Sequence, residues 1–188
     1  SIAEYMRKNA SQCRPLLYDS PLIEKLKILS VIHRRMVEEH TRYKNKLHYG
    51  IRQYFPLHEQ LFTHFACTAQ LKMIIKYPTF TDLKQVSENE LGEFLSMNSY
   101  RNPSGMHAMH KKIMAFDQLI SPEVEYAYRI ETTMICEILL MLNKKLKDIE
   151  SEMKHILDTH PLGKIFRSLP GAGPVLSGEL LEPISKIY

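Results

Sequence analysis

Two long stretches of the chain carry positions spaced alternately by four and three residues. The first series comprises Leu22, Leu26, Leu29, His33, Met36, His40, Tyr43, Leu47, Gly50 and Tyr54, and the second comprises Ile135, Leu139, Leu142, Leu146, Ile149, Met153 and Ile156. This spacing is that of a heptad seam, along which one helix packs against a partner helix. The pattern therefore predicts an all-α protein in which two long heptad helices form a coiled coil.

Serine and proline residues indicate where these helices begin and end. Ser20-Pro21 and Ser121-Pro122 each place a capping serine before a proline that suits the first helical position. Phe55-Pro56 and His160-Pro161 should end the helices, because proline disfavours helical geometry in the residue before it. A first helix of about 35 residues would be roughly 50 Å long, too long to bury its seam without a partner.

A bundle of short helices is expected between the two long ones. The apolar positions and the Pro, Ser and Thr signals predict one helix over 58–77, short helices beginning at Thr81 and Ser87, a polar loop over 98–105 and a helix over 106–120. The resulting organisation has three parts: an upstream end or connector over 1–19, a helical coiled-coil region over 20–160, and the start of a further domain over 161–188.

Composition favours a folded helical protein with a basic first third. Hydrophobic residues make up 44% of the chain, and seven glycines are few for its length. The net charge of +4 is unevenly spread, because residues 1–56 hold eleven Lys or Arg against five Asp or Glu. This bias favours a polyanionic partner, and the alternative is a solvated helix face.

Basic residues of the first long helix are the candidate nucleic-acid contacts: Arg34, Arg35, Arg42, Lys44 and Lys46. Arg35, Arg42 and Lys46 are spaced seven and four apart and share one stripe, which suits either a phosphate backbone or ion pairs across a coiled coil. Tyr43, Tyr49 and Tyr54 could stack on bases, but Tyr43 and Tyr54 lie on the seam and are expected to be packed.

The tail has a different character, with a Pro-Gly-Ala-Gly turn between two short helical segments. Gly171, Ala172 and Gly173 resemble the turn of a helix-hairpin-helix motif, where glycines let the backbone approach a phosphate and free N–H groups point at it. Lys164 and Arg167 lie close by in sequence and would add charge contacts. The alternative is a structural turn between helices that needs two glycines.

Other chemistry is weakly represented. Cys13, Cys67 and Cys136 are far apart without a CxxC motif, which favours a reduced, cytoplasmic protein. His107 and His110 have a ligand-like spacing, but no nearby Cys or carboxylate completes a metal site. The sequence shows neither a nucleophile elbow nor a P-loop. The most apolar stretch, 134–142, is too short to cross a bilayer.

Four segments together resemble the IS-one-ten family of insertion-sequence transposases, which are DEDD-type, RNA-guided recombinases. The run Leu169-Pro170-Gly171-Ala172-Gly173-Pro174-Val175-Leu176 is similar to the family hallmark LPGIGPVLA, although the family often has Ile at position 172. Three further segments match in order: 34–56 with its Arg-Arg and Lys-Asn-Lys-Leu-His motifs, Tyr77-Pro78-Thr79, and 158–161 before the hallmark.

The resemblance implies the central helical region and the start of the transposase domain. In that family an acidic, metal-dependent domain lies upstream and a catalytic serine lies downstream, so we expect no catalytic residue, cofactor or metal in this chain and a divalent metal in the upstream domain. The expected partners are DNA, a structured guide RNA and a second copy of the chain, without a membrane, in the bacterial cytoplasm. The chain alone would then be inactive.

Two hypotheses follow from the sequence. The first is a nucleic-acid-binding and dimerisation region of a DNA transposase. The alternative is a structural helical oligomerisation module without nucleic-acid binding, which would show negligible, salt-insensitive affinity.

Overall fold

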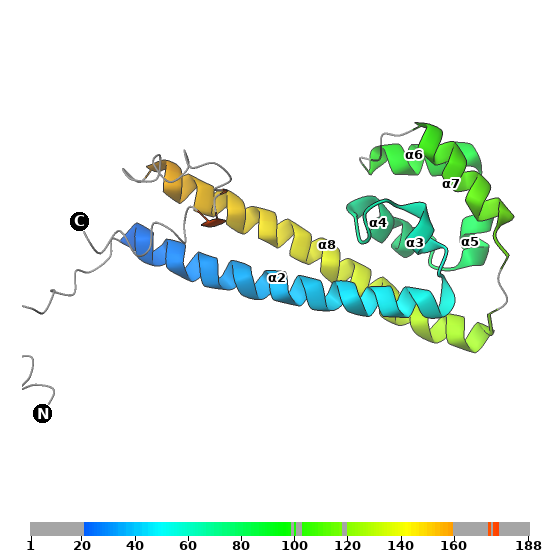
Figure 1. Ribbon diagram of the computed structural model, residues 1–188, viewed down its shortest axis with the longest axis horizontal. Coiled ribbons are helices and arrows are strands. Elements are labelled where there is room, and N and C mark those ends of the chain that lie inside the picture. The colour runs from blue at the N-terminus through cyan, green and yellow to red at the C-terminus, as the bar shows by residue number, and fades with distance from the viewer. Residues whose placement is uncertain are drawn as a thin grey trace, which may run out of the picture. The chain divides into compact units, whose positions relative to one another are not determined.

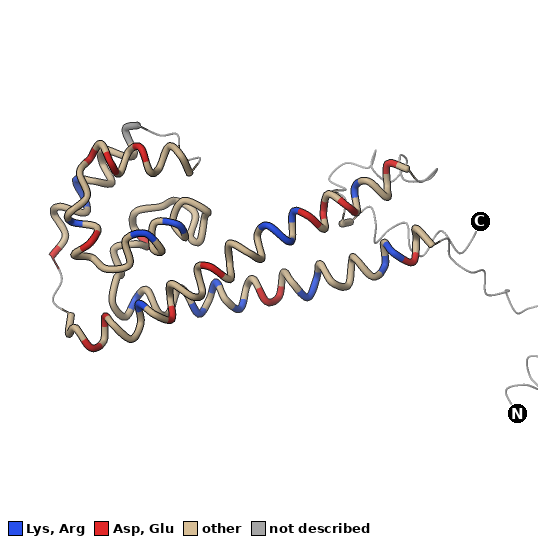
Figure 2. Tube along the Cα trace, turned by 180° about the vertical axis from the view of Figure 1, so that it is seen from behind, with Lys and Arg blue, Asp and Glu red and all other residues tan. Residues whose placement is uncertain are grey.

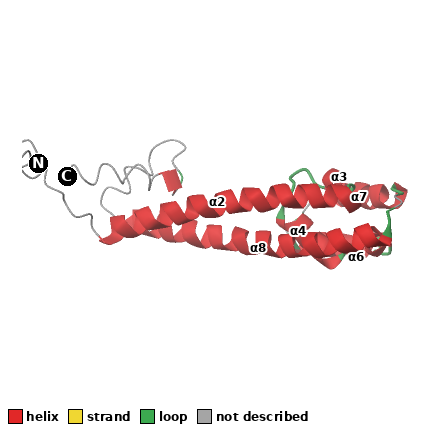
Figure 3. Cartoon of the chain, turned by 90° about the horizontal axis from the view of Figure 1, so that it is seen from below, coloured by secondary structure: helices red, strands yellow, loops and turns green. Residues whose placement is uncertain are grey.

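A computed structural model describes residues 21–98, 100, 103–117, 120–159, 173, 175 and 176. Their helices are α2 (Pro21–Tyr54), α3 (His58–Leu61), α4 (Thr68–Lys76), α5 (Phe80–Lys84), α6 (Glu88–Met97), α7 (Pro103–Ala115) and α8 (Pro122–Thr159) (Figure 1). Within these ranges no residue forms a strand, and Figure 3 shows only red helices joined by green loops there. The all-α prediction is therefore confirmed.

Both long helices begin and end where proline and serine predict. Helix α2 starts at Pro21 and stops at Tyr54, directly before Phe55-Pro56. Helix α8 starts at Pro122, and the Ser121 hydroxyl accepts a hydrogen bond from the Val124 amide at 3.3 Å. That bond satisfies one of the amides that a helix start leaves without a backbone partner.

The chain divides into two compact units, and the first holds residues 21–35, 147–159, 173, 175 and 176 among those described. Here the beginning of α2 packs against the end of α8, with Ile23, Leu26, Met153, Ile156 and Leu157 buried together. Two polar pairs flank this core: Lys25 contacts Glu152 at the surface, and the partly buried His33 Nε2 lies 3.2 Å from Glu150 Oε1. An exposed ion pair such as Lys25–Glu152 adds little stability.

In the second unit, Met36–Leu146, the remainder of α2 packs against the beginning of α8. Leu47 and Ile51 of α2 meet Ile135 and Leu139 of α8, and all four are buried. Leu71 and Ile74 of α4 complete this cluster. The short helices are thus joined to the helix pair by a shared apolar core.

The predicted seams agree in part with the observed burial, with a correction at the start of α2, and the coiled coil itself stays a prediction. Of the α2 series, Leu26, Leu47 and Tyr54 are almost fully buried, but Leu22 is 43% exposed. Ile23 is buried in its place, and Ile51 joins the buried face at the other end. Each added position is one residue from a seam position, so the buried stripe is wider than a strict heptad seam.

Gly50 marks a close approach between α2 and α8. A Cβ at this position would lie 2.8 Å from Thr132 Cγ2 and 3.8 Å from Tyr128 Cδ1. Beside it, the Tyr54 hydroxyl lies 2.8 Å from Thr132 Oγ1 in the buried interface. Burial raises the pKa of Tyr54 to about 12, against a lowering by the Thr132 hydrogen bond.

Another apolar cluster of the second unit holds the short helices together. Its buried members include Tyr54, Phe55, Leu83, Leu95 and Ile113. Capping side chains fix where two of these helices begin. Thr79 and Asp82 form a reciprocal capping box at α5, and Ser87 Oγ accepts from the Glu90 amide at 3.2 Å at α6.

The single helix predicted over 58–77 is wrong. Helix α3 ends at Leu61 and α4 begins at Thr68, with Ala66 between them at a φ of 62°. Gln70 stabilises this corner, because its Oε1 accepts from the Ala66 amide at 2.7 Å and its Nε2 donates to the His58 carbonyl at 2.8 Å. Tertiary hydrogen bonding therefore overrides the helical apolar pattern.

Two smaller boundaries also differ. Helix α7 spans Pro103–Ala115 rather than 106–120, and α5 begins at Phe80 with Thr79 as its cap rather than at Thr81. Proline at the first position of α7 accounts for its early start, because its fixed φ suits a helix.

Candidate nucleic-acid interface

A groove in the second unit brings basic and aromatic side chains together. Its volume is about 510 Å³, and it is lined by Arg42, Asn45, Lys46 and Tyr49 of α2 and by Tyr128 and Glu131 of α8. The four α2 residues have helical spacings of three, four and seven, so they share one face. Figure 2 shows basic positions recurring along α2.

Two tyrosines form the aromatic wall of this groove. Tyr49 is 62% exposed, whereas Tyr54 is buried on the seam. The Tyr49 and Tyr128 rings meet edge to face with centroids 6.5 Å apart. Hydrogen bonding to Tyr49 raises the pKa of Tyr128. An exposed aromatic ring held in this way offers a stacking surface to a planar ligand.

The two helices contribute opposite charges to the groove. Arg42 and Lys46 are exposed on the α2 side, and Glu131 is exposed on the α8 side. Arg42 Nη1 pairs with Glu39 Oε1 at 2.9 Å, and Lys46 Nζ lies 5.4 Å from the Tyr43 ring centroid. These contacts are weak at the surface, so both cations remain available to an anion.

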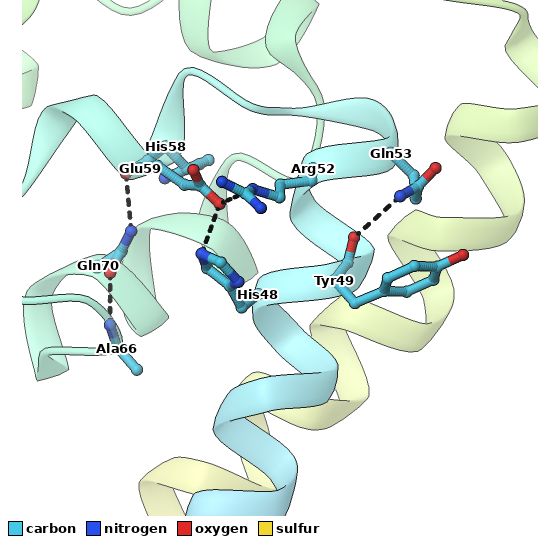
Figure 4. A network of polar contacts seen from close by, with 8 residues as sticks. All are labelled: His48, Tyr49, Arg52, Gln53, His58, Glu59, Ala66 and Gln70. Carbon is cyan, nitrogen blue, oxygen red and sulfur yellow. Dashed lines mark hydrogen bonds and ion pairs between the residues drawn. The ribbon is translucent and has the colours of Figure 1, made fainter.

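A separate charged cluster lies beyond the groove near the end of α2. Glu59 Oε1 is 2.9 Å from both His48 Nε2 and Arg52 Nε (Figure 4). These are ion-pair distances without aligned hydrogen bonds to that oxygen. Tyr49 points away from this cluster in Figure 4, and the Gln53 amide donates to its carbonyl at 3.5 Å. The carboxylate offsets the positive charge here, which makes this end of α2 a poorer anion site than the groove.

The groove brings together only part of the predicted contact set. Arg42 and Lys46 line it, whereas Lys44 is half-buried outside the lining. Arg34 and Arg35 are exposed and belong to the first unit.

Of the predicted hairpin contacts, only Gly173 lies among the residues that the structure describes. Lys164, Arg167, Gly171 and Ala172 lie outside the described residues. Gly173 is described and exposed, and a Cβ added there would meet nothing within 4 Å. The hairpin hypothesis therefore stays a prediction.

Sequence reasoning missed the α8 half of the groove. Tyr128 and Glu131 are about eighty residues from Tyr49, and no motif marks them. Only the pairing of α2 with α8 brings these residues into one groove.

The histidine pair on α7 contacts two different partners. His107 Nδ1 lies 2.8 Å from Glu88 Oε1, and His110 Nε2 lies 3.2 Å from the Val86 carbonyl oxygen. Across the described ranges no group of three or more His, Cys, Asp or Glu side chains could hold a metal ion. Cys136 is buried, and burial raises its pKa to about 12, which makes it a poor nucleophile.

The remaining surface gives weaker evidence of a site. A cleft of about 400 Å³ is lined mainly by apolar atoms, and its lining includes Phe62, His64, Cys67, Ala69 and Tyr100. In the part of the chain that the structure describes, no helix has both the length and the apolar character needed to cross a membrane.

Comparison with known proteins gives one informative similarity. The chain is 24% identical over 176 residues to the "Insertion element IS116 uncharacterized 44.8 kDa protein" of Streptomyces clavuligerus. The match covers 92% of this chain and 43% of that protein, so the chain spans less than half the length of its relative. No family model matches the sequence. No solved structure matches it either.

Fold and groove together define an all-α protein with a basic and aromatic surface on a helix pair. The similarity to an insertion-element protein supports the insertion-sequence part of the resemblance seen in the sequence. It suggests a role related to transposition. The IS-one-ten type and the DEDD chemistry stay predictions.

Proposed function

We propose that this chain is the nucleic-acid-binding and self-associating helical region of an insertion-sequence transposase. The observation that carries the proposal is the groove in which Arg42 and Lys46 stand beside the exposed Tyr49 ring. Cations beside an exposed aromatic ring suit a polymer of phosphates and bases. The insertion-element relative supplies a context in which nucleic acid is the natural partner.

The chemistry of the whole protein is proposed on the resemblance alone. It would break and rejoin DNA through a serine and through acidic residues with a divalent metal, under the direction of a guide RNA. The predicted hairpin around Gly171, Ala172 and Gly173 would add a phosphate contact, aided by Lys164 and Arg167. Arg34 and Arg35, in the first unit, would add phosphate contacts of their own.

Salt dependence of binding tests the phosphate contacts. We would titrate the 188-residue chain against a labelled folded RNA and a labelled DNA duplex by fluorescence anisotropy at several salt concentrations. Each phosphate neutralised contributes roughly 0.9 to the slope of log K against log salt for duplex DNA. Changing Arg42→Ala with Lys46→Ala should therefore reduce that slope by about two and weaken binding to both probes.

A matched control removes the same charge elsewhere in the same unit. Lys111 of α7 and Lys144 of α8 are exposed and do not line the groove. The double variant Lys111→Ala with Lys144→Ala should leave the slope nearly unchanged. Equal losses in the two double variants would reduce binding to general charge attraction, and no binding to either probe at low salt would refute the proposal.

A second candidate function is a structural oligomerisation module without nucleic-acid binding. The observation that favours it is an exposed apolar stripe on α8, formed by Tyr126, Ile130, Met134 and Met141, each more than half exposed. A shallow groove of about 330 Å³ adjoins it and is lined in part by Pro78, Ile130 and Met134. Exposed apolar surface of this kind commonly marks a protein contact.

A further inference from the structure

We infer that the groove lined by Tyr49 and Tyr128 holds an unpaired base of a single-stranded nucleic acid, stacked on the Tyr49 ring. The inference rests on the proposed function and adds to it which form of nucleic acid the groove recognises. It differs from phosphate binding along α2, because a duplex keeps its bases stacked on one another and offers no free face to Tyr49.

The geometry of the aromatic wall suits a stacked base. Tyr49 is 62% exposed, so its ring is accessible to a planar ligand. Its edge-to-face contact with Tyr128 fixes the ring, so a base would find a preformed surface. The groove volume of about 510 Å³ falls within the range of roughly 300–1,000 Å³ typical of small-ligand sites.

The charges of the groove suit a nucleotide lying across it. Arg42 and Lys46 lie on the α2 side and would contact the phosphates on either side of the base. Glu131 lies on the α8 side, where it would repel a phosphate but would accept a hydrogen bond from a base amino or imino group. Asn45 both donates and accepts, and lies one residue from Lys46. The groove therefore offers contacts for the phosphate, the base face and the base edge.

The backbone beneath the groove keeps this arrangement rigid. Gly50 follows Tyr49 and lets the two helices approach until a Cβ would be 2.8 Å from Thr132. Thr132 Oγ1 in turn donates to the Tyr128 carbonyl at 2.8 Å. The two tyrosines are thus attached to a tightly packed part of the interface, which limits the ordering cost of binding.

Asn45 and Glu131 of the lining suit a base edge and a ribose hydroxyl alike. The site is therefore assigned to the chemistry that single-stranded RNA and DNA share, a base with its flanking phosphates. Comparison of the two strand types in the experiment distinguishes them.

The test compares variants of the 188-residue chain on three labelled probes: a twelve-nucleotide uridine RNA, a twelve-nucleotide thymidine DNA and a mixed-sequence DNA duplex. Stacking on one aromatic ring contributes enough that Tyr49→Ala should weaken single-strand binding roughly 5- to 150-fold. Tyr49→Phe keeps the ring and should stay near wild type. Met97→Ala removes an exposed large side chain outside both the groove and the α8 stripe and should have little effect.

A spectroscopic measurement separates stacking from a structural effect. The chain contains no tryptophan, so Tyr49→Trp introduces a single reporter. Its emission should be quenched when either single strand binds, because a stacked base quenches indole fluorescence. Met97→Trp, outside the groove, should remain unquenched at the same occupancy.

The outcomes keep the two proposals apart. Weaker single-strand binding by Tyr49→Ala with unchanged duplex binding supports the inference, and a loss for RNA alone identifies the sugar. Unchanged binding by Tyr49→Ala, with binding still reduced by Arg42→Ala and Lys46→Ala, overturns the inference and leaves the proposed function standing. Equal losses on strand and duplex also overturn it. No binding of wild type to any probe at low salt overturns both.

Discussion

Gly50 shows how one missing side chain decides the spacing of two helices. Alanine is the better helix former by about 1 kcal/mol, so propensity alone would favour Gly50→Ala. The added Cβ would lie 2.8 Å from Thr132 Cγ2, on a β-branched side chain held by hydrogen bonds to Tyr54 and the Tyr128 carbonyl. Overpacking of this kind costs about 1–3 kcal/mol and should exceed the gain.

We therefore expect Gly50→Ala to lower the free energy of unfolding by about 1 kcal/mol, measured by urea denaturation followed by circular dichroism. Gly92→Ala is the matched control, because its Cβ would meet only Met106 Sδ at 4.0 Å. The control should be neutral or stabilising. An equal gain of stability in both variants would contradict the inference that Gly50 leaves no room for a Cβ beside Thr132.

His58 is a buried histidine whose two ring nitrogens have no hydrogen-bond partner. It packs against the Phe55 ring at 4.3 Å between centroids, and burial lowers its pKa from 6.5 to about 3. Between these two values the unfolded chain binds a proton that the folded chain excludes. Stability contributed by neutral His58 is therefore fully present above pH 6.5 and is lost as the pH falls toward 3.

The His58→Leu variant should show a flatter dependence of stability on pH. Because folded His58 excludes the proton, the free energy of unfolding of the wild type should fall by up to about 1.4 kcal/mol for each pH unit below 6.5. Urea unfolding at pH 7, 6 and 5 measures the difference between the two proteins. His64→Leu, an exposed site, should follow the wild type. Parallel curves for His58→Leu and wild type would exclude the proposed burial effect.

At the scale of elements, Gln70 sets the corner between α3 and α4. Its side chain pairs with the Ala66 amide and the His58 carbonyl, both at buried positions. Gln70→Leu keeps a similar volume but leaves both backbone groups unpaired, each at a cost of about 1–3 kcal/mol. We expect a loss of at least 2 kcal/mol in a thermal or urea unfolding experiment.

Gln53→Leu provides the comparison for that experiment. Gln53 is exposed, and its amide contacts the Tyr49 carbonyl within a helix that already satisfies that oxygen. The change should alter stability by less than about 0.5 kcal/mol. A similar loss in both variants would mean that the corner does not depend on Gln70.

The elements divide into those that sequence signals predict and those that they do not. Ser121-Pro122 and Phe55-Pro56 define helix ends locally, so α8 begins and α2 ends as expected. The break between α3 and α4 depends on Gln70 reaching back to His58, a tertiary contact that no local pattern contains. Apolar spacing over 58–77 therefore predicted one helix where two are separated by a corner.

The candidate site divides in the same way. Arg42 and Lys46 were predicted to share a stripe, because helical spacing alone places them on one face of α2. Tyr128 and Glu131 join them only through the pairing of α8 with α2, and the register of that pairing depends on the packing of Gly50 against Thr132. The half of the site that lies on the second helix was therefore beyond sequence reasoning.

At the scale of the whole molecule, the α8 stripe predicts self-association. Ile130→Lys with Met134→Lys places two charges in the middle of the exposed apolar surface. We expect the wild type to sediment as a dimer and the double variant to shift toward monomer, because burying a charge without a partner is costly. Sedimentation equilibrium over a range of concentrations measures the masses.

Met97→Lys is the control for this prediction, since Met97 is the strongly exposed apolar residue at the end of α6 and lies away from the stripe. It should leave the mass distribution unchanged. A wild type that is monomeric at all concentrations would refute the α8 contact and remove the support for the oligomerisation candidate.

The close fit at Gly50 also limits how α2 and α8 of the second unit can move. Paired helices often rearrange by sliding one past the other by a single turn. A slide of that size would bring Lys46 or Tyr54 to the point where Thr132 leaves no room for a Cβ. Sliding is therefore blocked in both directions, and any rearrangement of this pair must first separate the helices. Separation would take Tyr49 away from Tyr128, so the groove could open or close but could not shift by one turn along the helices.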